Sequence, residues 1–145
     1  MFEQIKELIS NAKKLNQTQL LIEVFTDVKI QDEIVFYITE IQLFEKGVDG
    51  LGKELKKYTP FTVSEKKRKG QKFKTTTLKD TGKFYNSFKV VVNQGGDVKV
   101  VANDINDLTD KYGINILTLS DEGIEKIKPK VIEKITEYVV QTLCT

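Results

Sequence analysis

The sequence contains no histidine and no tryptophan, and it has one cysteine and two prolines in 145 residues. Without histidine, the chain lacks the commonest general base of enzymes and the commonest metal ligand of proteins. Zinc sites made of cysteine and histidine, and catalytic triads built around histidine, are therefore excluded within one chain. The single cysteine, Cys144, has no second thiol in the chain to pair with, which fits a reducing site of synthesis.

Long hydrophobic runs are also missing. No stretch approaches the roughly 18 apolar residues that a membrane-spanning helix needs. The N-terminal sequence MFEQIKELIS has early acidic residues and no apolar core of a secretory signal. Hydrophobic residues make up 39% and charged residues 30% of the chain, which is ordinary for a globular protein. We therefore expect a single domain, residues 1–145, with a core of its own and no membrane contact.

The charge is distributed unevenly, although the net charge is only +2. Residues 1–52 carry five lysines and nine acidic residues, and residues 75–145 carry nine lysines and ten acidic residues. The whole basic excess therefore falls in residues 53–74, which we call the basic segment. Such asymmetry indicates an oriented electrostatic surface. The residues that we expect to face DNA or a protein interface are Lys66, Lys67, Arg68, Lys69, Lys72 and Lys74.

Helical periodicity marks the start of the chain. Apolar residues recur at helical spacing over residues 2–15 and again over 17–28, with Asn16 placed as a cap between them. Residues 31–44 are ambiguous, because their continuous apolar run fits a buried helix or a strand. We favour a short helix followed by a strand at 41–44.

Turn residues predict two hairpins. Gly47, Asp49-Gly50 and Gly52 supply turn chemistry after the first expected strand, with a return strand near 53–58. Residues 88–92 and 98–102 predict a second pair of strands, joined through Gly95-Gly96.

Between the hairpins, the stretch 65–70 fits one helical turn that ends at Gly70, or a mobile loop. Asp80 is placed to cap a short helix that extends to Tyr85 or Asn86. Phe84 and Phe88 are four residues apart, and we expect them in the core rather than stacked on nucleic-acid bases. Tyr85 fits either environment.

The C-terminal part predicts helices. Asn106 is placed to cap a turn of helix over 107–112, with Gly113 just past its end. Ser120 is a natural cap for the strongest helical pattern in the chain. Pro129 falls inside that pattern, so the helix either kinks there or a new helix begins there.

These elements indicate an α+β fold, in which a small antiparallel sheet of two hairpins packs with N-terminal and C-terminal helices. The helical N-terminal part is residues 1–40, the hairpins and basic segment occupy 41–102, and the C-terminal helices occupy 103–145.

Two short motifs suggest chemistry but have simpler explanations. Asp80-Thr81-Gly82 is also the signature of aspartic proteases, which need two such aspartates. The chain has one, and it is flanked by Lys79 and Lys83 where those enzymes have apolar and small residues. Three aspartates at 104, 107 and 110 lack the glycine and terminal glutamate of a calcium loop, and helix caps explain them. We expect no catalytic residues, no metal and no cofactor.

Five segments follow one another in a recognisable order. The first reads Gln-Leu-Phe-x-x-Gly-Val-Asp-x-x-Gly at 42–52, and Tyr-Thr-Pro-Phe-Thr follows at 58–62. A Lys-Gly-Gln turn occurs at 69–71. The last two are Thr-Leu-x-Asp-Thr-Gly-x-Phe-x-x-Ser at 77–87 and Tyr-Gly-x-x-Ile-Leu-x-Leu-Ser at 112–120. Together they extend over more of the chain than any single short motif does.

On these segments the chain resembles small morphogenesis proteins of tailed bacteriophages, those of the head–tail junction or of tail completion. It is most similar to the versions in crAss-like phages and related Bacteroidales prophages. The resemblance implies a structural virion protein, assembled in the host cytoplasm, that forms a ring around the portal, neck or tail axis. The structural motif residues that it marks are Gly47, Asp49, Gly52, Tyr58, Pro60, Asp80, Thr81 and Gly82.

The implied partners are further copies of the chain and other virion proteins such as portal, adaptor or tail proteins. Head-to-tail contacts between identical copies would close the ring, and lysines could hold packaged DNA without reading its sequence. The alternative is a small non-specific nucleic-acid-binding protein that uses the basic segment. With only one arginine in that segment, sequence-specific readout is not expected.

Overall fold

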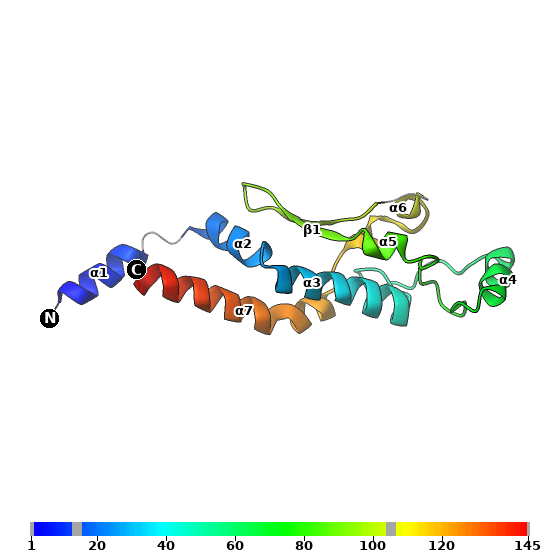
Figure 1. Cartoon of the computed structure of the whole chain (residues 1–145), viewed down its shortest axis with the longest axis horizontal. Coiled ribbons are helices and arrows are strands. Elements are labelled where there is room, and N and C mark those ends of the chain that lie inside the picture. Colours follow the sequence, from blue (N-terminus) through cyan, green and yellow to red (C-terminus); the bar gives the residue numbers. More distant parts are fainter. Residues whose placement is uncertain (1, 13–15, 104–106, 145) are drawn as a thin grey trace.

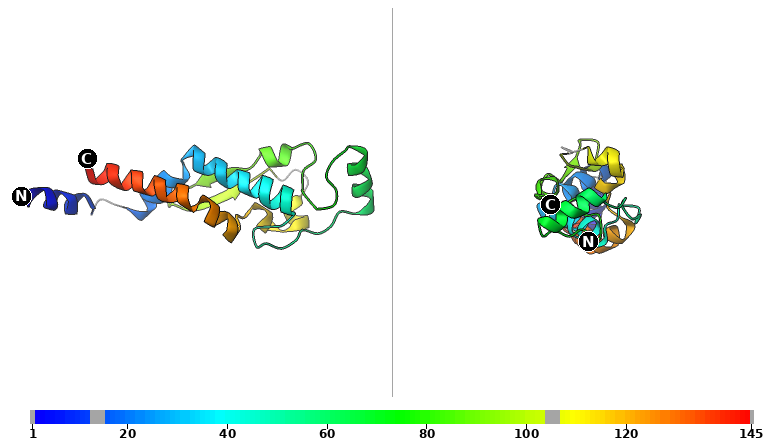
Figure 2. Two further views of the ribbon diagram at one scale, coloured as in Figure 1. Left: turned by 90° about the horizontal axis from the view of Figure 1, so that it is seen from below. Right: turned by 90° about the vertical axis from the view of Figure 1, so that its right-hand side faces the viewer.

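A computed structural model describes residues 2–12, 16–103 and 107–144 of the chain. The molecule is elongated, with both chain ends near one tip and helix α4 (Pro60–Arg68) at the other tip (Figure 1). Seen along this axis its cross-section is small (Figure 2). Within the described residues, no helix has the length and apolar character needed to cross a membrane.

The first three helices have clear start signals. Helices α1 (Glu3–Ala12), α2 (Gln17–Phe25) and α3 (Val28–Phe36) follow one another. The Gln19 N–H donates to the Asn16 side chain at 3.1 Å, which confirms the predicted cap. The predicted helix over 17–28 ends earlier, because Asp27 accepts the N–H groups at the start of α3 and thereby begins a new helix.

The ambiguous apolar run is helical throughout, so the predicted strand at 41–44 is wrong. Helix α3 continues directly into a π-helix, η1 (Tyr37–Lys46), which ends at Gly47 in the left-handed conformation with a φ of +63°. Ile38 and Leu43 are fully buried on η1. A strand points alternate residues to opposite faces, whereas the residues buried on η1, such as Gln42 and Leu43, lie four and five positions after Ile38, as on one side of a helix.

The first predicted hairpin is reduced to a single bridge between Val48 and Glu54, so the return strand at 53–58 is also wrong. The turn is held by the backbone bonds of this bridge, Asp49 N–H to the Lys53 carbonyl and Leu55 N–H to the Gly47 carbonyl, both at 2.9 Å, and by a side chain. The Asp49 carboxylate accepts the N–H groups of Leu51 at 2.9 Å and Lys53 at 3.0 Å. A side chain that binds its own loop in this way adds to the little backbone pairing that a single bridge supplies.

Helix α4 begins with Pro60 at its first position, and the Thr59 hydroxyl accepts the Thr62 N–H at 3.3 Å. Its last turn carries Lys66, Lys67 and Arg68, and Gly70 follows with a φ of +69°. The helical interpretation of 65–70 is therefore confirmed in place of the mobile loop, but the helix already begins at Pro60 and ends at Arg68, two residues before Gly70.

The predicted cap at Asp80 is wrong. Helix α5 (Lys83–Asn86) is preceded by Gly82 at a φ of +88°, and it has no side-chain cap. Asp80 lies two residues too early to reach the first N–H groups of α5, and its carboxylate binds Lys69 and Gln71 instead.

The second hairpin is confirmed. Strands β1 (Lys89–Val92) and β2 (Val98–Val101) pair antiparallel, with Lys89 opposite Val101 and Val92 opposite Val98. The turn is closed by the Asn93 side chain, which accepts N–H groups from the residues that follow it. In the described chain, β1 and β2 form a sheet of two strands.

The end of the chain is mostly helical. Helix α6 (Leu108–Tyr112) and a 3₁₀ turn, η2 (Ile114–Leu117), meet at Gly113, which lies just past the helix end as predicted and has a φ of +90° and a ψ of 155°, a conformation that favours glycine. The predicted cap Asn106 lies outside the described residues. The Gly123 N–H donates to the Ser120 hydroxyl at 3.1 Å, which confirms the cap of α7 (Asp121–Cys144).

Helix α7 runs through Pro129 without a second start. Proline has no N–H for the carbonyl four residues earlier, and the helix axis changes direction in this region (Figure 2). Of the two alternatives for Pro129, a kink in one helix or the start of a new helix, the structure therefore shows the first.

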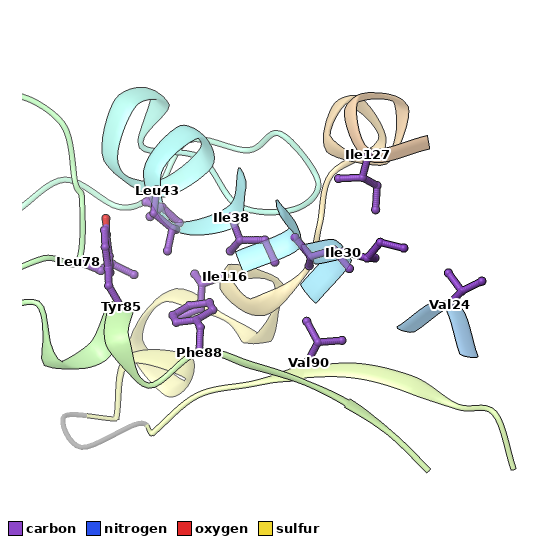
Figure 3. Close-up of a cluster of buried hydrophobic side chains, with 12 residues drawn as sticks. Val24, Ile30, Ile38, Leu43, Leu78, Tyr85, Phe88, Val90, Ile116 and Ile127 are labelled. Carbon is purple, nitrogen blue, oxygen red and sulfur yellow. The ribbon is translucent and has the colours of Figure 1, made fainter. Parts of the chain in front are cut away.

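The core lies between the helices and the hairpin. Helices α2 and α3 contact both α7 and β1, so they form the central layer. Buried side chains from η1, α5, β1 and η2 meet beneath them (Figure 3). Phe88 is buried, Phe84 packs against it with ring centroids 5.0 Å apart, and Tyr85 is also buried. The core positions of Phe84 and Phe88 are confirmed, as is the α+β fold class.

Candidate functional site

The five segments that the sequence singled out, at 42–52, 58–62, 69–71, 77–87 and 112–120, contact one another in the folded chain. The first and last are joined at Gln42, a residue of η1 that is almost fully buried. Its side-chain amide donates to the Thr118 carbonyl at 2.9 Å, and its side-chain oxygen accepts the Ser120 N–H at 2.7 Å. Both ends of one glutamine amide therefore fix the chain that leads into α7.

The glycine turn of the first segment packs against the same place. The Gly50 N–H donates to the Asn115 carbonyl at 2.9 Å. A Cβ atom on Gly50 would lie 2.3 Å from the Thr118 carbonyl oxygen, far inside contact distance. A Cβ atom on Gly47 would lie 3.1 Å from the Thr75 Cβ and 3.2 Å from the Thr76 carbonyl oxygen, a tight contact, whereas nothing lies within 4 Å of the Cβ position on Gly52. Gly47, Asp49 and Gly50 thus hold a folded turn in place.

The second and fourth segments meet at Tyr58. Its hydroxyl accepts the N–H groups of Thr77 at 3.0 Å and of Leu78 at 2.9 Å. Leu78 is buried with a φ of +59°, a conformation that is unfavourable for a branched side chain. The two bonds from Tyr58 stabilise this strained backbone and tie it to the chain that leads into α4.

The third and fourth segments meet beside Asp80. Lys69 Nζ lies 3.0 Å from the Asp80 carboxylate, and the Gln71 side chain donates to the same carboxylate at 3.1 Å. The hydrogen bond from Gln71, followed by that from Lys69, lowers the pKa of Asp80 below its ordinary value. Thr81 and Gly82 complete the turn into α5, with the Thr81 hydroxyl accepting the Lys83 N–H at 3.4 Å.

A pocket opens where these contacts surround α4. It has a volume of about 500 Å³, and its wall includes Tyr58, Lys66, Lys69, Leu78, Asp80 and Phe84. Four of the eight motif residues that the sequence marked, Tyr58, Asp80, Thr81 and Gly82, line it. The others lie outside its wall: Pro60 begins α4, and Gly47, Asp49 and Gly52 belong to the turn that packs toward Thr118.

Lys66 is not placed as a lysine that faces DNA. Its residue is only 7% exposed, and its ammonium group donates to the Lys79 carbonyl at 2.8 Å and to the Gln71 side chain at 3.4 Å. The ammonium group also lies 4.9 Å from the centre of the Tyr58 ring. Helix α4 turns this side chain inward, where the ammonium group links two loops.

The neighbouring basic residues are exposed but take part in local contacts. Arg68 pairs with Glu65 at 2.8 Å, and Lys67 lies over the Phe73 ring at 4.9 Å. Lys72 donates to the carbonyl oxygens of Phe44 at 2.7 Å and of Glu45 at 3.2 Å, at the end of η1. Lys72 therefore supplies a positive charge and a donor where a helix leaves its carbonyls unpaired. Lys74 is exposed.

In the residues that the structure describes, no group of three Asp, Glu or Cys side chains is placed so that it could hold a metal ion. Of the three aspartates with a spacing of three, Asp104 lies outside the described residues. Asp107 precedes α6 in a left-handed conformation, and Asp110 lies on that helix.

Sequence reasoning missed a second hollow, which we call the apolar groove. It runs between β2 and the first half of α7, is about 960 Å³ in volume, and is floored by Phe25 and Ile34 of the central helices. Residues along its sides include Val98, Val101, Ile114, Ile124, Ile127 and Val131. One signal was present in the sequence, because β2 is apolar at three of its four positions and thus has an apolar residue on each face.

Helix α1 presents a second apolar surface, which we call the α1 stripe. Ile5 and Ile9 of α1 are 51% and 55% exposed, and Phe2, which directly precedes the helix, is 64% exposed; the spacing of three and four residues places them on one side. Helix α1 contacts α7 and lies beside the C-terminal end of that helix (Figure 1). The sequence predicted the amphipathic pattern but not that the apolar side would face outward.

Comparison of the chain with protein-family models, with curated proteins and with solved structures finds no match.

Proposed function

We propose that this chain is a structural protein of a tailed phage, a subunit of a ring at the portal, neck or tail junction. The observation that carries the proposal is the contact of the five resembling segments with one another. Gln42 bonds the 118–120 chain, Tyr58 bonds 77–78, and Lys69 and Gln71 bond Asp80. The segments therefore build one connected part of the fold, which is what the proposal requires of residues that a family shares.

The surfaces of the molecule are suited to repeated assembly. A ring closed by head-to-tail contacts needs two different surfaces on each copy, because the same patch never meets itself. The apolar groove and the α1 stripe are two such surfaces, and they lie on different parts of an elongated molecule. The two-stranded sheet adds a third opportunity, since an isolated pair of strands is marginal in water without further packing.

The alternative, a non-specific nucleic-acid-binding protein, has weaker support. Phosphate binding of that kind depends on several lysines that release counterions together. Lys66 is buried, and Lys69 and Arg68 hold carboxylates of the same chain. A role in contacting packaged DNA within a ring remains part of the proposal through exposed residues such as Lys67 and Lys74.

The test is quantitative mass spectrometry of particles purified from the phage whose genome encodes the chain. A connector subunit is expected at a small, fixed ratio to the major capsid protein, and this ratio should survive a high-salt wash and nuclease treatment. A nucleic-acid binder that adheres to particles should be removed by salt, because its affinity falls steeply with ionic strength. Absence of the chain from washed, intact particles would overturn the proposal.

A further inference from the structure

We propose that the α1 stripe of one copy of this chain docks into the apolar groove of the next copy. This inference rests on the proposed function only for the closure of the array into a ring. The contact itself is argued from two surfaces of the isolated chain, and it commits to a second copy as the occupant of the groove.

The α1 stripe has the form of a helix that binds a groove. Its apolar residues Phe2, Ile5 and Ile9 follow the i, i+3, i+7 spacing by which amphipathic helices lay one side into a hydrophobic channel. More than half of each residue is exposed in the single chain. Three large apolar side chains in one exposed row are costly to leave in water, so the row favours a partner surface.

The apolar groove has the complementary character. Its volume of about 960 Å³ exceeds what one or two side chains would fill. Of the residues that line it, Val101, Ile114 and Ile124 stay substantially exposed, while Ile34 and Ile127 are buried. A lining of this kind, apolar with few inward polar groups, suits a helix side better than it suits a small polar ligand, which needs converging donors and acceptors.

The charges at the two surfaces are opposite. The titratable residues that line the groove are Lys99 and Lys128, both exposed. Lys128 pairs with Glu125 of α7 at 3.0 Å, so Lys99 supplies most of the basic character of this rim. Helix α1 carries Glu3 and Glu7, both exposed, against one lysine, Lys6, which pairs with Glu3 at 3.2 Å. A net acidic helix beside a basic rim gives the electrostatic match that selects a partner and its orientation.

The groove of the same chain is not within reach of α1 in this structure. Helix α1 lies beside the C-terminal end of α7 (Figure 1), whereas the groove uses Ile124 to Val131 near its start. At 1.5 Å per residue, the thirteen residues from Val131 to Cys144 place α1 about 20 Å from the groove along α7. Because the two surfaces are far apart and not equivalent, docking between copies is head-to-tail and repeats.

Cross-linking of two variants tests the contact directly. Ile5→Cys in one population and Ile124→Cys in the other, both with Cys144→Ser, are given tags of different mass, mixed and treated with a short bis-maleimide. Docking predicts a mixed cross-linked dimer. The matched control replaces Ile124→Cys with Phe61→Cys, which is equally free to react because Phe61 is strongly exposed, but which lies on α4 outside the groove. The mixed dimer is expected at about ten times the control yield.

A charge exchange separates docking from chance collision. Lys99→Glu with Lys128→Glu in the groove population should reduce the mixed dimer to the control level, and Glu3→Lys with Glu7→Lys in the α1 population should restore it. All four positions are exposed, so these variants are expected to fold. Circular dichroism and the melting temperature check that expectation.

Two results would overturn the inference: a mixed dimer no more abundant than the control, or a loss that the exchanged charges do not restore. The proposed function fails separately, if washed particles lack the chain. A ring in the particle without the mixed dimer therefore leaves the function standing and removes this contact.

Discussion

At the scale of single residues, Lys66 shows how a basic sequence can mislead. The stretch reads as a charged surface, yet the Lys66 ammonium group lies inside, bonded to the Lys79 carbonyl and the Gln71 side chain. We expect Lys66→Ala to lower the free energy of unfolding by about 1–3 kcal/mol, because a buried carbonyl loses its donor and the stem loses its packing. Urea unfolding measures this loss.

The adjacent Lys67 is the control for that experiment. It is exposed and lies over the Phe73 ring, so Lys67→Ala is expected to change the free energy of unfolding by no more than about 0.5 kcal/mol. Equal stability of the two variants would contradict the structural role of Lys66.

Tyr85 gives a pH dependence. Burial raises the pKa of its hydroxyl above the ordinary value of about 10, and the hydroxyl donates to the Thr77 carbonyl. The unfolded chain therefore releases this proton near pH 10 while the folded chain keeps it. The stability contributed by Tyr85 is complete below pH 10 and is lost as pH rises toward the folded pKa.

Tyr85→Phe should therefore lower stability at pH 7 by about 1 kcal/mol through the lost hydrogen bond, and it should flatten the further fall between pH 9 and about 11. Thermal melts across this range measure both effects. Tyr138→Phe, at a half-buried position of α7 outside the buried core cluster, should keep the fall of the unaltered protein. A fall in Tyr85→Phe as steep as in that control would contradict the assignment.

At the scale of elements, the turn at 47–52 is fixed by contact with a distant part of the chain. Gly50→Ala is expected to cost about 2–3 kcal/mol of unfolding free energy, because the new methyl group meets the Thr118 carbonyl at 2.3 Å. Gly52→Ala is the matched control, since its methyl group meets nothing and only the φ of +77° is strained, at about 1 kcal/mol. Chemical denaturation should rank the two in this order; the reverse ranking would contradict the packing.

The elements that the sequence predicted well are those with local causes. The hairpin at 89–101, the caps at Asn16 and Ser120 and the helix end just before Gly70 each depend on residues within a few positions of one another. The strands expected at 41–44 and 53–58 failed for a tertiary reason. Gln42 is bonded to the 118–120 chain, and Ile38 and Leu43 pack in the core, so packing decided between helix and strand.

Part of the candidate site could also be predicted from the sequence. The sequence marked Tyr58, Asp80, Thr81 and Gly82, and the fold brings them to one pocket. The sequence could not show that the Lys66 side chain points inward, because the loops that pack against α4 decide which side of this helix faces the protein. The apolar groove was also out of reach, since it is formed by β2, η2 and α7 only after they pack together.

At the scale of the whole molecule, self-association should depend on salt. The lysines at the groove and the glutamates on α1 attract one another across solvent, and this attraction is screened as the Debye length falls from about 14 Å near 0.05 M salt to about 4 Å near 0.5 M. Sedimentation equilibrium should show weaker association at the higher salt concentration. In Lys99→Glu with Lys128→Glu the association should already be weak at low salt; salt-independent association of the unaltered chain would contradict the charge match.

The central claim is that this chain forms a ring at the head–tail junction of a tailed phage. The most direct measurement is cryo-electron microscopy of intact particles from the phage that encodes it, reconstructed at the portal and neck. The account predicts density for repeated copies of this elongated fold arranged around the axis in that region. A reconstruction in which the portal, neck and tail are fully assigned to other chains would contradict it.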